Sequence, residues 1–271
     1  MLARGIAGVL LLLNLAAVPP PELRTPTAKW MVEFADNDCI VSRYYGTSRD
    51  DAVILAFKRV PMQDGIDVYL IKDNPKTNAW RNGRAKIDFG SGKPIDAKFG
   101  AFEVTSGLRR IALSIEDESY RTAVQSGRVS LIIPGESDDS FAVPNFGGAL
   151  KLLDLCVANL SDAWGIPKDQ QTRIKVKAKP AGSWDRIFVS QDYPPDAMQA
   201  NASGRTVVRY AVDETGHPSD CVVLKQSGTP SLDQRTCSVL MRRGRFKPAL
   251  DANDKPMRSL MVTGVGWLMF E

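Results

Sequence analysis

Histidine is the first residue to examine, because much acid–base, nucleophilic and metal chemistry in proteins depends on it. The 271-residue chain has a single histidine, His217, which lies between Gly216 and Pro218. This setting is typical of a solvated hairpin turn. A Ser-His-Asp triad or a histidine-rich metal site would need more such residues than the chain supplies. We therefore interpret His217 as a turn residue rather than a catalytic base.

Carboxylates are the next candidates for chemistry, and they gather in the segments DNDC, EDES and ESDD. Their spacing does not match a calcium loop, and we interpret all three as solvated turns. The segment FGSGKP lacks the earlier glycine of a phosphate-binding loop, and Pro94 replaces its hydroxyl residue. An enzyme alternative would use Glu33, Asp36 and Asp38 as the carboxylates of a hydrolase. The favoured interpretation is a non-enzymatic protein without a cofactor or a metal ion.

The N-terminal residues are typical of an export signal. Arg4 precedes an apolar run from residue 5 to residue 18, and the small pair Ala16-Ala17 comes just before PPPE. A membrane-spanning helix needs about 20 apolar residues, so this run is short for one. We predict that residues 1–18 form a cleaved signal peptide, with Leu15 as its one atypical position. The alternative is a short anchor that stays uncleaved.

The predicted export favours disulfide bonds between the cysteines. There are four, Cys39, Cys156, Cys221 and Cys237, and an even number in an oxidising compartment indicates two disulfides. No CxxC spacing is present, which argues against a zinc site. Pairing by proximity predicts Cys39–Cys156 and Cys221–Cys237, because the other pairings would cross the domain boundary proposed below.

Length and composition indicate a folded protein of about two domains. Hydrophobic residues make up 44% of the chain and charged residues 24%, which is ordinary for globular proteins. The formal net charge of +4 suits weak attraction to an anionic surface. It is too small to indicate nucleic acid as a partner.

Residues 28–168 are expected to form a β-rich domain. Runs such as CIVSRYY, AVILAFKRV and DVYLIK are rich in β-branched and aromatic residues and are separated by turn-forming segments. The period then changes, with Leu150, Leu153, Val157, Leu160 and Trp164 recurring at steps of three and four. We expect an antiparallel sheet with this one long helix packed on one face.

Two further segments complete the chain. Residues 169–186 contain alternating lysines and then Pro-Ala-Gly, and we interpret them as a linker. The run RIKVKAK is alternatively a last edge strand protected by its lysines. Residues 187–271 give the order strand, strand, helix, strand, which predicts a three-stranded antiparallel sheet backed by a helix. The fold class expected for the whole chain is α+β.

The segment from about Gln191 to Phe270 resembles the C-terminal domain of TonB, the energy transducer of Gram-negative cell envelopes. The matching pieces come in order: YPPDA, SGRTVVRYAVDETGHPSDCVVLKQSG, LDQRTC and RRGRFKPALDANDKP. Together they extend over roughly a third of the chain. The paired Cys221 and Cys237 resemble a variant seen in some relatives. Residues 28–168 resemble no family that we can name.

This resemblance implies a use for the final strand, SLMVTGVGWLMF. In TonB domains the last strand is an open edge, and the TonB box of an outer-membrane receptor adds to it as an extra strand. Gly264 and Gly266 either let a peptide backbone approach or mark a bulge. The alternative is that the strand is buried by its own helix and a second copy. The residues expected to bind the partner peptide are Gln191, Tyr193, Pro194, Ser259, Met261, Thr263, Val265 and Trp267.

Basic residues cluster just before the final strand. They are Arg242, Arg243, Arg245 and Lys247. Positive charge at the end of a helix is favoured by the helix dipole, so a solvated helix end is one interpretation. The other is a basic surface that meets peptidoglycan or anionic lipid.

The favoured function is a periplasmic binding protein. Its partner would be an outer-membrane TonB-dependent receptor or another envelope protein, and two copies could pair through the last strand. The alternative is a membrane-tethered energy transducer, which must keep residues 1–18 and needs a long spacer. The Pro-rich tract VPPPELRTP is short, and a folded domain stands where the spacer should be.

Overall fold

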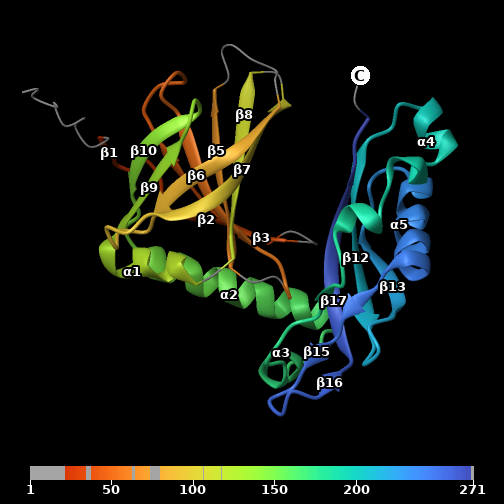
Figure 1. Cartoon of the computed structure of the whole chain (residues 1–271). Coiled ribbons are helices and arrows are strands. Elements are labelled where there is room, and N and C mark those ends of the chain that lie inside the picture. The colour runs from red at the N-terminus through yellow and green to blue at the C-terminus, as the bar shows by residue number, and fades with distance from the viewer. Residues whose placement is uncertain are drawn as a thin grey trace, which may run out of the picture.

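The protein is described from a computed structural model that covers residues 22–34, 38–62, 65–73, 80–105, 107–116 and 118–269. Two lobes are visible, an N-terminal β-rich lobe and a C-terminal lobe with a smaller sheet (Figure 1). The predicted signal segment, residues 1–18, lies outside the described residues. The predicted α+β fold class is confirmed, because both lobes combine an antiparallel sheet with a helix.

The N-terminal lobe is built on one ten-stranded sheet. All neighbouring strands pair antiparallel except β1 and β10, which are parallel. Along β5 and β8 buried residues alternate with more exposed ones, as expected when one face of a pleated sheet covers a core. The strands, in order across the sheet, are β1 (Leu23–Arg24), β10 (Ser137–Ala142), β9 (Arg128–Ile133), β6 (Arg81–Asp88), β7 (Ile95–Thr105), β8 (Leu108–Ile115), β5 (Ile66–Asp73), β4 (Val53–Arg59), β3 (Cys39–Tyr45) and β2 (Met31–Phe34).

The segment after β1 draws the two ends of this sheet together. β1 pairs with β10, and Pro26 then forms a bridge with Tyr45 at the end of β3. The N–H of Thr27 also donates to the Tyr44 carbonyl at 3.0 Å. The sheet therefore curls into a barrel whose interior is filled by apolar side chains (Figure 1).

Helix α2 (Phe146–Ala163) runs along one end of the barrel (Figure 1). Its buried residues include Leu150, Leu153 and Leu160, which confirms the predicted apolar face. The ring of Phe146 packs against Phe57 with centroids 4.6 Å apart. Gly165 follows the helix with a positive φ of 63°, a conformation that glycine adopts without strain and that ends the helix.

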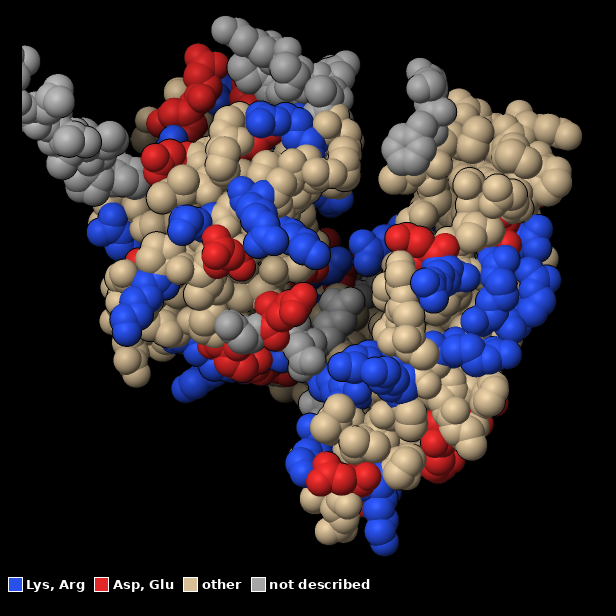
Figure 2. All heavy atoms as spheres, in the orientation of Figure 1, with Lys and Arg blue, Asp and Glu red and all other residues tan. Residues whose placement is uncertain are grey.

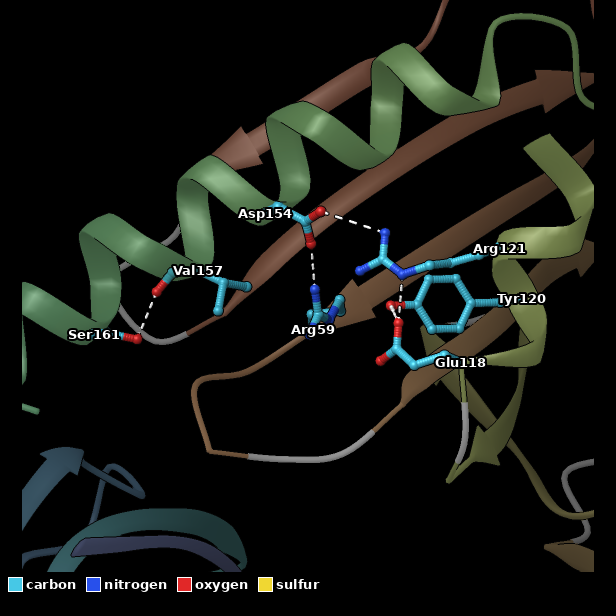
Figure 3. Close-up of polar contacts among 7 residues, drawn as sticks. All are labelled: Arg59, Glu118, Tyr120, Arg121, Asp154, Val157 and Ser161. Atoms are coloured by element: carbon cyan, nitrogen blue, oxygen red, sulfur yellow. Dashed lines mark hydrogen bonds and ion pairs between the residues drawn. The ribbon is translucent and has the colours of Figure 1, made fainter. Parts of the chain in front are cut away.

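A disulfide and a polar network fix α2 to the barrel. The predicted Cys39–Cys156 disulfide is confirmed, and it joins β3 to the helix. Asp154 of α2 contacts both Arg59 of β4 and Arg121 (Figure 3). Arg121 lies in the 3-10 helix η1 (Ser119–Thr122), which leads into α1 (Ala123–Ser126).

Tyr120 and Glu118 extend this network. The Tyr120 hydroxyl donates to the Glu118 carboxylate at 2.8 Å (Figure 3). Burial of the ring, aided by this hydrogen bond, raises the pKa of Tyr120 to about 12. Glu118 belongs to the segment EDES, for which a solvated turn was predicted, and its side chain is 55% exposed. Tyr120 and Arg121 hold it beneath α2.

The segment ESDD differs from its predicted turn. Ser137, Asp138 and Asp139 are the first residues of strand β10. Glu136, just before them, forms a buried ion pair with Arg109 of β8. Aspartate is uncommon in strands, so these residues carry no local strand signal. Pairing with β9 along six residues overrides that weak propensity.

The predicted linker, residues 169–186, has structure of its own. Helix α3 (Gln170–Arg173) is followed by β11 (Lys179–Pro180), which pairs with β14 (Phe246–Lys247) of the C-terminal lobe. Val176 forms a further bridge with Leu250. Much of the segment therefore packs on the C-terminal lobe, and the domain limits drawn from the sequence stay a prediction.

The C-terminal lobe has the predicted strand, strand, helix, strand order. Its sheet has the order β13, β12, β17, and α5 lies on the face turned away from the barrel (Figure 1). The Cys221–Cys237 disulfide is confirmed and joins β13 to α5. Closing a loop of this length contributes about 3 kcal/mol of stability. The elements are η2 (Trp184–Arg186), η3 (Ser190–Asp192), α4 (Pro195–Gln199), β12 (Gly204–Val212), β13 (Pro218–Lys225), α5 (Pro230–Arg243), β15 (Ala249–Leu250), β16 (Pro256–Met257) and β17 (Ser259–Trp267).

Candidate functional site

Strand β17 lies at the edge of the C-terminal sheet. It pairs antiparallel with β12 in unbroken register from Ser259, opposite Val212, to Trp267, opposite Gly204. Among the described residues no strand pairs with its other side. The opposite edge of the sheet, β13, pairs with β12 through two register shifts. β17 is therefore the longer and more regular of the two edges.

The odd-numbered side chains of β17 face α5. Trp267 is buried, and its indole N–H donates to Thr236 of α5 at 3.0 Å. The Thr263 hydroxyl bonds to the Tyr210 hydroxyl at 3.1 Å, and burial raises the pKa of Tyr210 to about 12. Met261 packs on the same core, and Ser259 is almost fully buried. These side chains anchor the strand within the domain.

Gln170 reveals which backbone groups of β17 point outward. Its side-chain carbonyl accepts the Leu260 N–H at 3.0 Å, and its amide nitrogen donates to the Leu260 carbonyl at 3.2 Å. The backbone N–H and carbonyl of Leu260 therefore point away from β12. Because the direction of the backbone groups alternates along an antiparallel strand, the N–H and carbonyl groups of Val262, Gly264 and Gly266 also point away from β12. No hydrogen bond joins their outer groups to another residue in the described part of the chain.

The predicted peptide-binding residues of β17 thus alternate along the strand with the residues whose backbone groups point outward. Ser259, Met261, Thr263, Val265 and Trp267 direct their backbone groups toward β12 and their side chains toward α5. Met261, Thr263 and Val265 are only half-buried, so their side chains remain accessible beside the edge. Whether any of the five contacts a partner stays a prediction.

The YPPDA segment packs against the end of β17. The Tyr193 ring lies 5.5 Å from the Trp267 ring in an edge-to-face contact, and its hydroxyl donates to the Ala202 carbonyl. Pro194 is buried, and Gln191 is exposed. Tyr193 therefore fixes the position of α4 against the sheet, and only Gln191 of the three offers a free side chain to solvent.

Gly264 and Gly266 differ in their surroundings. A Cβ atom at Gly264 would come within 2.4 Å of the Arg205 guanidinium, which lies over the strand. A Cβ atom at Gly266 would meet nothing within 4 Å. The register with β12 is continuous through both residues, so neither marks a bulge between these two strands. Glycine at 264 leaves room for Arg205, and glycine at 266 leaves the edge open.

The predicted basic cluster divides into two parts. Arg243 forms an ion pair with the buried Asp192 and donates to the Ile187 carbonyl at 2.9 Å, so it belongs to the inner structure of the domain. Arg242, Arg245 and Lys247 are exposed. Figure 2 shows Lys and Arg side chains gathered on the C-terminal lobe.

The carboxylates of the enzyme alternative do not come together as a site. Asp38 forms an ion pair with Lys58 at 2.8 Å, Glu33 is exposed on β2, and Asp36 lies outside the described residues. No group of three or more metal-ligating side chains occurs in the described ranges.

A pocket of about 560 Å³ lies elsewhere on the barrel, between Arg24, Asp51 and Asp139. Two of the carboxylates that line it, those of Asp51 and Asp139, have partners. Hydrogen bonds from the Ser48 backbone and hydroxyl, and from the Thr47 backbone, lower the pKa of Asp51. Asp139 accepts from Arg24 at 2.6 Å. These contacts hold the loops of the barrel in place.

Gln170 is a residue of this edge that was not among the predicted ones. It lies in the predicted linker, and its partner Leu260 is 90 residues away. A glutamine at the start of a four-residue helix carries no local signal of such a contact.

The comparison with known families agrees with this architecture. Residues 189–263 match the family model of the Gram-negative bacterial TonB protein C-terminal domain. The matched segment contains α4, β12, β13 and α5 and ends within β17. It covers a little over a quarter of the chain and leaves out the barrel.

The C-terminal lobe is thus a TonB C-terminal domain, and the resemblance seen in the sequence is confirmed. Domains of this family are associated with envelope transport and are not enzymes. No curated protein matches the chain. The part of the chain that the structure describes contains no helix that could span a lipid bilayer.

Proposed function

We propose that the C-terminal domain binds an extended segment of another envelope protein at the outer edge of β17. The segment adds to the sheet as a fourth strand, by β-augmentation. The observation that carries this proposal is the row of outward backbone groups at Val262, Gly264 and Gly266. The family of the domain supports an outer-membrane receptor with a TonB-box segment as the partner, and the periplasm as the place.

The chemistry of such an edge favours a partner in extended conformation. Backbone hydrogen bonds supply affinity whatever the guest sequence, while alternate guest side chains supply selectivity. On one face of the sheet the guest side chains would lie beside Met261, Thr263 and Val265, and on the other face they would lie beside Arg205. Figure 2 shows a cleft between the lobes, and β17 runs along its C-terminal side (Figure 1). A guest strand would enter this cleft.

A matched pair of variants at Gly266 tests the proposal. Gly266→Pro removes an outward N–H, and proline is tolerated at sheet edges where the N–H faces solvent. Gly266→Ala keeps the N–H and places its methyl group in open space. In calorimetric titration of the full chain with a synthetic TonB-box peptide, we expect Gly266→Ala to bind as the parent does. Gly266→Pro should bind at least about tenfold more weakly.

Two results would contradict this function. One is the absence of peptide binding by the parent protein together with no protection of the Val262, Gly264 and Gly266 amides. The other is equal binding by the two Gly266 variants when thermal unfolding shows both to be folded. Concentration-dependent self-association that Gly266→Pro abolishes would instead favour pairing of two copies through β17.

The tethered energy transducer remains the alternative. It depends on residues 1–18, which the mature protein must keep in order to stay at the inner membrane. N-terminal sequencing of the mature protein, with fractionation into membrane and soluble material, decides between the two. A mature sequence that begins near Val18 would end the tethered alternative.

A further inference from the structure

The Gln170 side chain occupies the place of a neighbouring strand. Its carboxamide accepts from the Leu260 N–H and donates to the Leu260 carbonyl, which is the pair of bonds that a residue on an adjacent strand would make. Gln170 and Leu260 are both buried. The amide nitrogen also lies 3.5 Å from the Met62 sulfur, a residue of the turn that follows β4. The contact therefore joins the barrel, α3 and β17.

The segment that carries Gln170 is fastened to the sheet at a second point. Arg209 of β12 donates to the Trp164 carbonyl at the end of α2. At the start of α3, the Gln170 N–H donates to the Pro167 carbonyl at 3.0 Å. Residues 164–170 are thus tied to β12 through Arg209 and to β17 through Gln170.

The two ends of the β17 edge are consequently unlike. At the first end, Leu260 and Val262 pack in the same apolar cluster as Trp164 and Ile166. At the other end Gly266 is exposed. A guest strand that approaches the open end would meet Gly266, Gly264 and Val262 in turn and would then meet the Gln170 carboxamide.

We propose that Gln170 acts as an internal competitor that fixes where pairing on β17 stops. This inference rests on the proposed docking function. While Gln170 is in place, a guest strand pairs with Val262, Gly264 and Gly266 only. When α3 leaves, the Leu260 groups become available and the guest gains a further pair of hydrogen bonds. The segment between the lobes thereby limits the affinity of the C-terminal edge.

The test compares three full-length variants. Gln170→Ala removes the carboxamide, and Gln170→Asn keeps a polar group that is one methylene too short to reach Leu260. Thr172→Ala is the control, because Thr172 is exposed on α3 and its hydroxyl donates only to the Asp169 carbonyl. The two Gln170 variants keep the test usable if one of them fails to fold.

Amide hydrogen exchange without any ligand gives the first readout. We expect the Leu260 amide to exchange about tenfold faster in both Gln170 variants than in the parent, because a hydrogen bond of ordinary strength is lost. The control should exchange as the parent does. Unchanged Leu260 exchange in both folded variants would overturn the inference.

Titration with a synthetic TonB-box peptide gives the second readout. The Gln170 variants should bind about threefold or more tightly than the parent, with the Leu260 amide protected in their complexes. Equal affinity, with Leu260 unprotected in every complex, would overturn the inference and leave the docking function intact. If neither parent nor variant binds and the amides of Val262, Gly264 and Gly266 stay unprotected, both proposals fail.

Discussion

At the scale of single residues, Glu136 is a buried carboxylate of the barrel that is paired with arginine. Its side chain is 4% exposed and accepts two hydrogen bonds from Arg109, at 2.6 and 2.7 Å. Arg81 lies 3.3 Å from the same carboxylate. The Arg109 hydrogen bonds, together with the charges of Arg109, Arg81 and Lys72, lower the pKa of Glu136. A carboxylate that is this well paired is stabilising only while it stays ionised.

We predict that Glu136→Gln lowers the free energy of unfolding by about 3 kcal/mol at neutral pH, because it removes the carboxylate charge that pairs with the buried Arg109. Asp138→Asn is the control, since Asp138 is exposed in the same acidic segment.

The folded-state pKa of Glu136 lies below the unfolded value, which is about 4.3. Its contribution is therefore complete above that pH and is lost as the pH falls through the folded pKa. Urea unfolding at about pH 7 and about pH 3 should show the difference between Glu136→Gln and parent shrinking in acid. A difference that is constant with pH would contradict this role of the carboxylate.

At the scale of elements, the pair β11 and β14 sets like charges opposite one another. Lys179 faces Lys247 in the register, and both side chains are exposed. Like charges directly opposite on paired strands are destabilising. The pair is kept in place by its neighbours, since Phe246 beside Lys247 is buried in the domain core.

Replacing Lys247 tests the size of this repulsion. Lys247→Glu should raise the free energy of unfolding by about 0.5 kcal/mol, and Lys247→Gln by about half as much, because it removes the repulsion without adding attraction. Chemical denaturation at low and high salt measures both. The gain from Lys247→Glu should fade in about 1 M salt, where charges are screened within about 3 Å. Equal stability of all three proteins at low salt would show that the two lysines do not interact.

The elements also show what could be predicted from sequence. The periodic apolar residues of α2, the order of β12, β13, α5 and β17, and both disulfides followed from local pattern and cysteine spacing. Strand β10 did not, because its Asp138 and Asp139 read as a turn and only pairing with β9 makes them a strand. The Gln170 contact did not either, because a side-chain amide that meets a backbone 90 residues away leaves no periodic trace.

At the scale of the whole molecule, the two lobes share one apolar cluster. Ala211 of β12 and Leu260 of β17 pack in the same cluster as Trp164 and Ile166. Arg209 and Gln170 add polar bonds across the same contact. Burial of apolar surface between lobes couples their unfolding, because neither lobe can open without exposing part of the shared cluster.

Arg209 gives a direct measure of that coupling. Its guanidinium donates to the Trp164 carbonyl, and a hydrogen bond from a charged group contributes about 1.5–3 kcal/mol. Arg205 is the comparison variant, because it lies on the same strand and the same face and its guanidinium lies over Gly264. In differential scanning calorimetry we expect Arg205→Ala to keep the parent's transition. Arg209→Ala should lower the melting temperature or split the transition into two, as the lobes begin to unfold separately.

If Arg209→Ala and the parent gave the same thermogram, the lobes would be joined by the apolar cluster and Gln170 alone. The restraint on the β17 edge would then reside in the Gln170 carboxamide and the packing of Leu260.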